Sequence, residues 1–192
     1  MWLGCFAAVV ALNGSWIPVD QFVGGPPRVV RGSDAAILAL AAALPTVLHP
    51  RLSSWERINP HPTVRVLKVF LGLGATLATA LLVWIDHTWI VPAASWRPAA
   101  VNAVSMSALA QLGSALAGPA LVAPGCISLY WAAVAVEQHE PGSGHLLSVL
   151  AAAPPHTVPL PAAAALVVAS AICTATTLGR SRRSTLQDRN RA

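Results

Sequence analysis

The sequence predicts an all-α fold, a polytopic membrane bundle of about six transmembrane helices that forms one domain over residues 1–179. The first observation is composition: of 192 residues, 55% are hydrophobic and 10% are charged, whereas about 25% of an ordinary soluble domain is charged. The second is that the long runs are apolar on every face, unlike the amphipathic helices of a soluble bundle. The third is that the charge lies in short stretches between these runs and is divided unevenly among them.

The central spans are set by apolar runs and by the residues that interrupt them. "VRVLKVFLGLGATLATALLVWI", residues 64–85, is the clearest span, because it is unbroken after Arg65 and Lys68. Residues 98–136 contain no charge, but a helix of this length would reach about 58 Å, close to two bilayer cores. The run must therefore fold back at "GPALVAPG", whose prolines break helix. The six predicted spans are residues 2–19, 33–49, 64–85, 98–117, 119–136 and 159–179.

The first two predicted spans are the weakest. Asn13, Gly14 and Pro18 interrupt the first of them. The second, which Asp34 can cap, depends on the run "AAILALAAALPTVL", about 21 Å of helix against a hydrocarbon core of about 30 Å. It can cross a membrane only by including polar residues at both ends.

The distribution of charge predicts the orientation. If residues 51–68 and the tail, residues 180–192, share one side, that side holds nine basic and two acidic residues, and the other side holds three basic and five acidic residues. Basic residues are enriched in cytoplasmic loops, so we interpret the net charge of +5 as an orientation signal and not as a nucleic-acid footprint. Six spans then place both termini and the basic tail in the cytoplasm, with the chain in the plasma membrane.

"RLSSWERINPHPTVRVLK", residues 51–68, is the first candidate functional stretch. Ser53 and Glu56 have the spacing of a capping box, and the prolines that follow predict a helix of one or two turns, after which Thr63 can cap the next span. This short helix is either an anchor whose arginines contact anionic lipid or a docking helix for a cytoplasmic ATPase subunit. The candidate coupling residues are Ser53, Trp55, Glu56, Arg57 and Ile58.

A polar face on the fourth predicted span is the second candidate. Its members recur at helical spacing and are Asn102, Ser107, Gln111 and Ser114. One interpretation is a packing seam in which small and polar side chains hydrogen-bond between helices. The other is the wall of a substrate path. The third span has small residues of its own at Gly72 and Thr76, which would let a neighbouring helix approach.

No motif predicts a catalytic, cofactor or metal site. The chain lacks P-loop spacing and the HExxH, GxSxG and CxxC patterns, so we expect no enzyme activity and no cofactor, and any ATPase on another chain. Asp86 and His87 are expected at the membrane interface, where a span ends. Residues 137–145, "EQHEPGSGH", have side chains that suit zinc, but their glycines and proline predict a solvated external loop. No charge lies at the centre of a predicted span, which disfavours an ion pump or a proton-coupled transporter.

Two stretches, "LPTVLHPRLSSWERINPHPTVRVLK" and "LAQLGSALAGPALVAPG", give the chain a layout that resembles small membrane subunits of actinobacterial ABC-2-type transport systems. The resemblance implies about six spans, a short basic cytoplasmic helix after the second span, and an ATPase on a separate chain. The chain would then be an exporter permease that works as a homodimer or beside a second permease. The alternative is a non-transporting accessory, immunity or scaffold membrane protein. In both cases the surrounding partner is the lipid bilayer, and nucleic acid is not expected.

Overall fold

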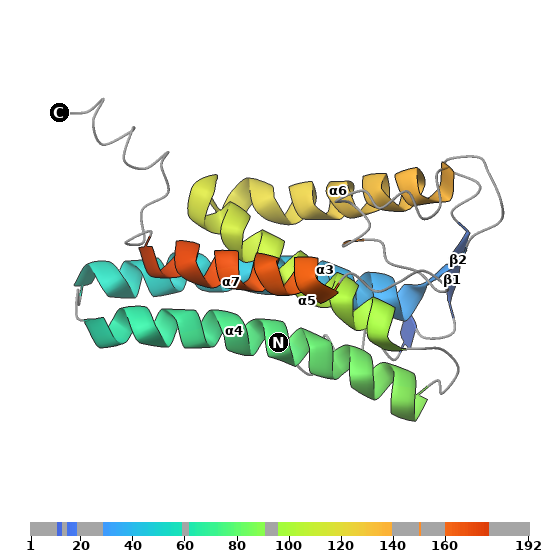
Figure 1. The fold of residues 1–192 in the computed structure, drawn as a ribbon, viewed down its shortest axis with the longest axis horizontal. Coiled ribbons are helices and arrows are strands. Elements are labelled where there is room, and N and C mark those ends of the chain that lie inside the picture. The colour runs from blue at the N-terminus through green and yellow to red at the C-terminus, as the bar shows by residue number, and fades with distance from the viewer. Residues whose placement is uncertain are drawn as a thin grey trace.

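The computed structural model describes residues 11–12, 15–18, 29–58, 62–90, 96–139, 150 and 160–176. Over these residues the chain is a bundle of helices with one small sheet (Figure 1), which fits the predicted all-α fold. The helices are α3 (Gly32–Ile58), α4 (Pro62–Ile85), the π-helical turn η1 (Asp86–Ile90), α5 (Trp96–Leu116), α6 (Pro119–His139) and α7 (Leu160–Thr176), and the strands are β1 (Trp16–Pro18) and β2 (Val29–Arg31). Within this described part of the chain, four stretches are long and apolar enough to cross a membrane: Gly32–His49, Pro62–Trp89, Trp96–Leu116 and Pro119–Val136.

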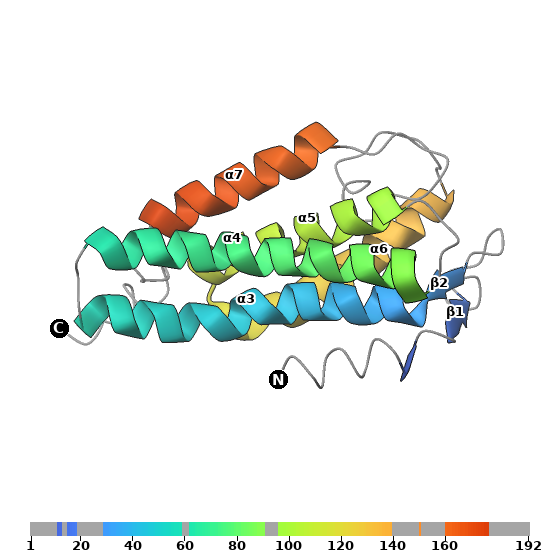
Figure 2. The ribbon, with the colours of Figure 1, turned by 90° about the horizontal axis from the view of Figure 1, so that it is seen from below.

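The helices run back and forth along one axis and meet at two ends of the bundle (Figures 1 and 2). At the end that we call the hairpin end, α3 is followed by α4 and α5 is followed by α6. At the opposite end, which we call the strand end, β1 and β2 pair in antiparallel register. The last helix, α7, crosses the bundle obliquely and finishes near the hairpin end (Figure 2).

The innermost helix is α5, which packs against α3, α4, α6 and α7. Its buried residues are mostly alanine and serine, and such small side chains let neighbouring helices approach closely. In contrast, α4 turns large apolar side chains outward, among them Phe70 at 66% exposed and Leu77 at 69%. Polar groups inside and large apolar groups outside suit a lipid surrounding, so the chain has the construction of a membrane protein.

The uncharged run folds back between α5 and α6. Gly118, which lies between these helices, has a φ of 94°, a left-handed conformation that glycine adopts without strain. The next residue, Pro119, opens α6, where a proline costs no helical hydrogen bond. Pro124, the second proline of this stretch, lies inside α6 and does not break it.

The helix α3 corrects the prediction for residues 51–58. It continues through Pro45 and Pro50 without a break, so Ser53 lies inside a long helix and is not the N-cap of a separate short one. Each proline removes one backbone donor, but membrane helices tolerate this because neighbouring helices and hydroxyl side chains satisfy the freed groups. The packing of α3 against three other helices outweighs the local signals for a break.

The start of α4 also differs slightly from the prediction. The helix begins at Pro62, a residue favoured at the first helical position because its missing N–H would have no helical partner there. Thr63 is therefore the second residue of the helix and does not cap it.

The structure describes the first and the last predicted spans only in part. Trp16–Pro18 form β1, so a helix over residues 2–19 cannot reach its predicted end; β-branched side chains such as Ile17 and its partner Val30 favour the strand. Most of that span lies outside the described residues, as does the tail, residues 180–192. At 17 residues, α7 reaches about 25 Å, less than a hydrocarbon core of about 30 Å.

Candidate functional site

Two buried polar clusters lie inside the bundle. The first, which we call the seam, joins α4 to α5 and consists of Gly72, Thr76, Ser107 and Gln111. The side-chain amide of Gln111 donates to the carbonyl of Gly72 and to Oγ1 of Thr76, each at 2.8 Å. The hydroxyls of Thr76 and Ser107 are 3.1 Å apart. The three side chains are buried and find their partners within the seam.

Antiparallel packing of α4 and α5 creates the seam. Gly72 faces Gln111, and four residues further along α4, Thr76 faces Ser107, which lies four residues earlier on α5. Gly72 allows this close approach: a Cβ built there would lie 3.0 Å from Oε1 of Gln111, so the side chain of Gln111 would have to shift. The absence of a side chain lets the amide reach the helix backbone directly.

The polar face predicted on the fourth span is buried throughout, but its members have different roles. Ser107 and Gln111 bond to α4. The hydroxyl of Ser114 donates to the carbonyl of Ala110 within its own helix, at 2.7 Å. Asn102 lies on the same helix, nearer the strand end, and its side chain is 8% exposed. The packing interpretation accounts for the contacts of Ser107 and Gln111.

A small cavity adjoins the seam on the side of the hairpin end. Its volume is about 20 Å³, enough for one water molecule, and its lining includes His49, Lys68, Gln111 and Thr174. Lys68 is only 2% exposed, although it stands at the end of a polar stretch of the sequence. Its burial could not be predicted from local pattern, because one face of α4 turns inward only when α3, α5 and α7 pack around it.

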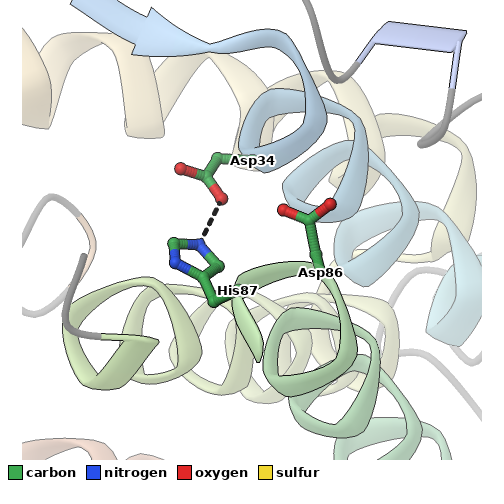
Figure 3. A group of neighbouring side chains, drawn as sticks. All are labelled: Asp34, Asp86 and His87. Atoms are coloured by element: carbon green, nitrogen blue, oxygen red, sulfur yellow. Dashed lines mark hydrogen bonds and ion pairs between the residues drawn. The ribbon is translucent and has the colours of Figure 1, made fainter. Parts of the chain in front are cut away.

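The second cluster, which we call the strand-end cluster, consists of Asp34, Asp86 and His87, shown in Figure 3, together with Ser33. Nε2 of His87 lies 3.0 Å from Oδ1 of Asp34, and the Ser33 hydroxyl donates to Oδ2 of Asp86 at 3.1 Å. Asp86 is 1% exposed and His87 is 6% exposed. Among the residues described, Oδ1 of Asp86 and Nδ1 of His87 have no hydrogen-bond partner.

The hairpin of α3 and α4 brings the strand-end cluster together. Ser33 and Asp86 are 53 positions apart, as are Asp34 and His87, and both pairs are nearly symmetric about the turn between the two helices. The side chains of Asp86 and His87 are buried within the bundle, and their expected place at the membrane interface stays a prediction. The signal that could have found the cluster was this symmetry: Asp34 begins one span, Asp86 ends the next, and an antiparallel hairpin places them at the same level.

The structure describes the backbone but not the side chains of the candidate coupling residues, and it describes only part of residues 137–145, the stretch whose side chains suit zinc. Residues 53–58 form the last turns of α3 at the hairpin end, and their side chains lie outside the described part of the chain. Residues 137–139 end α6 at the strand end, and residues 140–145 fall outside the description.

No protein-family model, no curated protein and no solved structure matches this chain. The resemblance to ABC-2-type membrane subunits therefore stays a prediction, and the functional argument depends on the geometry of the bundle.

Proposed function

We propose that the chain is a membrane-spanning subunit of a transport system, an ABC-type exporter permease driven by an ATPase on a separate chain. The observation that carries the proposal is the continuity of α3. Its membrane-crossing part ends at His49, but the helix continues to Ile58. This extension, residues 50–58, contains two arginines and a glutamate, which suits it to the aqueous side of a membrane.

A continuous helix can transmit a displacement from its tip to the membrane. With 27 residues, α3 is about 40 Å long, and it packs against α4, α5 and α6. An ATPase that moved residues 50–58 would shift α3 against all three neighbours. Rocking of helices between two packed arrangements is an established way for a membrane protein to alternate its access.

The directions of the helices support a cytoplasmic hairpin end. Residues 51–58 lie at that end, and α7 finishes there, so the basic tail follows from the same side. The strand end holds Asp34 and Asp86. A basic end and an acidic end are the division that the positive-inside rule predicts. Six spans with both termini in the cytoplasm, in the plasma membrane, are part of the proposal.

The seam favours a second candidate function, that of a non-transporting accessory or scaffold protein. Its hydrogen bonds hold α4 against α5, and buried polar groups that satisfy one another fix one arrangement of helices. A protein whose task is to hold a partner in the membrane needs such a fixed arrangement.

The coupling role is tested with Trp55→Ala combined with Arg57→Glu. We expect at least about tenfold less ATPase to co-purify with the variant in mild detergent, together with loss of transport. Arg97→Glu is the matched control, because it makes the same change of charge at an exposed residue of the strand end and should leave co-purification unchanged. If no ATPase accompanies the wild-type chain, or if the double variant keeps it, the scaffold function takes its place.

Topology is tested separately with single cysteines at Ser54 and Ser143 in a background free of other cysteines. An impermeant thiol reagent added to intact cells should label Ser143→Cys and not Ser54→Cys, since the six-span arrangement puts them on opposite sides. Labelling of both from one side would exclude that arrangement.

A further inference from the structure

The strand-end cluster has the composition of a metal site. We propose that Asp34, Asp86 and His87 bind a divalent transition-metal ion of the Zn²⁺ type. Each residue offers one ligand atom, and these three atoms lie within 4.8 Å of one another. The proposal concerns the end of the bundle opposite to the coupling helix and does not depend on the proposed function.

The geometry is close to that of a bound ion. Zinc bonds of about 2.0–2.2 Å place neighbouring tetrahedral ligands roughly 3.4 Å apart, so no pair of ligand atoms, all within 4.8 Å of one another, must close by more than about 1.4 Å. The Nε2–Oδ1 distance between His87 and Asp34, 3.0 Å, already falls near this spacing. Figure 3 shows the carboxylate of Asp86 with one oxygen turned toward the Asp34–His87 pair.

Buried ligand atoms with unused bonding capacity are a second observation. Oδ1 of Asp86 has no hydrogen-bond partner among the described residues, although the side chain is almost fully buried. An uncompensated buried carboxylate is costly unless a cation or donors satisfy it. Arg31 provides one positive charge near Asp86, so the two carboxyl groups of the cluster outnumber this described cation.

The backbone at the site also differs from an ordinary helix. Asp86 and His87 are the first two residues of the π-helical turn η1, and short π-helical turns inside helices are frequent at functional sites. Here the turn presents two consecutive side chains to the start of α3, where Ser33 and Asp34 receive them.

The ligand types select the ion. Imidazole with carboxylates suits Zn²⁺ and similar first-row ions, whereas Mg²⁺ and Ca²⁺ prefer sites made of oxygen alone with six or more ligands. Three protein ligands leave a fourth position for water. The side chain of Asp34 is 23% exposed, which gives the ion access from the strand end. Once bound, the ion would clamp the start of α3 to the end of α4.

The test is a titration of the chelator-stripped full chain in detergent with Zn²⁺, followed by calorimetry. We expect binding of one ion per chain and at least about tenfold weaker binding in Asp86→Asn and in Asp34→Asn. Mg²⁺ should not bind in its place. The double variant His139→Ala, His145→Ala is the matched control, because it removes both histidines of residues 137–145, the stretch whose side chains suit zinc, and should leave the affinity unchanged.

Several results would overturn the proposal. The first is the absence of saturable Zn²⁺ binding at about 1 mM free Zn²⁺. The second is an undiminished Zn²⁺ affinity in Asp86→Asn. The third is a loss of binding only in the His139/His145 variant, which would assign the ion to residues 137–145. Asp86→Asn keeps an acceptor for Ser33, and circular dichroism checks its folding. If Asp86→Asn fails to fold, the Zn²⁺ affinity of Asp34→Asn tests the proposal instead, since the partly exposed side chain of Asp34 tolerates the change. Co²⁺ gives an independent readout, because a tetrahedral site with a nitrogen ligand should produce visible absorption that Asp34→Asn abolishes.

Discussion

The seam and the strand-end cluster are both buried, both polar and both formed between antiparallel helices, but they differ in charge and in completeness. The seam is neutral, and its side chains are donors and acceptors for one another. The strand-end cluster contains two carboxylates and an imidazole and leaves Oδ1 of Asp86 without a partner among the described residues. A satisfied neutral network stabilises packing, whereas an incomplete charged one is suited to a ligand.

The middle of α4 and the turn η1 that follows it have different roles. Near the middle of α4, small residues and hydroxyls hold α5 in place. In η1, Asp86 and His87 reach the start of α3. Variants should therefore separate the two regions: changes in the seam lower stability, and changes in the strand-end cluster alter ion binding with a smaller effect on stability.

The largest effect is expected from Gly72→Leu. A Cβ at this position lies 3.0 Å from Oε1 of Gln111, so a larger side chain must push α5 away and break the seam. Overpacking of this kind costs about 1–3 kcal/mol, and the lost interhelical hydrogen bonds add to it. Thermal unfolding in detergent measures the loss. Gly74→Leu is the matched control, because a Cβ there meets nothing within 4 Å and should change stability by less than about 0.5 kcal/mol. Equal losses in the two variants would contradict the role given to the seam.

A smaller effect is expected from Thr76→Val and Ser107→Ala, whose hydroxyls are 3.1 Å apart. Each variant should cost about 0.5–1.5 kcal/mol, and the double variant should cost less than their sum by about 0.6 kcal/mol, a typical coupling for such bonds between membrane helices. Thr88→Val is the control: its hydroxyl bonds only to the carbonyl of Trp84 in an exposed position, and we expect almost no change. Strict additivity of Thr76→Val and Ser107→Ala would show that the two hydroxyls do not interact.

The smallest effect is expected from Asp34→Asn, measured in the presence of a chelator. The asparagine oxygen can still accept from Nε2 of His87, and the pair is partly open to solvent at Asp34, so the loss should stay below about 1 kcal/mol. The same unfolding experiment with Zn²⁺ should stabilise the wild-type chain and not the variant. If Asp34→Asn in chelator destabilised the chain as much as Gly72→Leu, the strand-end cluster would be a structural element and the contrast between the two regions would disappear.

Local sequence signals predicted much of the fold. The apolar run over residues 64–85 became α4, and "GPALVAPG" gave the reversal between α5 and α6 at Gly118. Spacing also found Ser107 and Gln111 on one face, because helical periodicity needs no knowledge of neighbours. Local signals failed where they conflict with packing: the capping-box pattern at Ser53 predicted a separate short helix, but α3, which packs against three other helices, continues through this stretch.

The sequence by itself determined that this is an apolar, largely helical chain with few charged residues, since composition and period depend only on residue type and spacing. Only the tertiary structure decided which distant residues meet. The burial of Lys68, the pairing of Thr76 with Ser107 and the meeting of Asp34 with His87 all depend on how far each helix extends and how it is rotated against its neighbours. These quantities follow from side-chain packing across the bundle, and no local pattern encodes them.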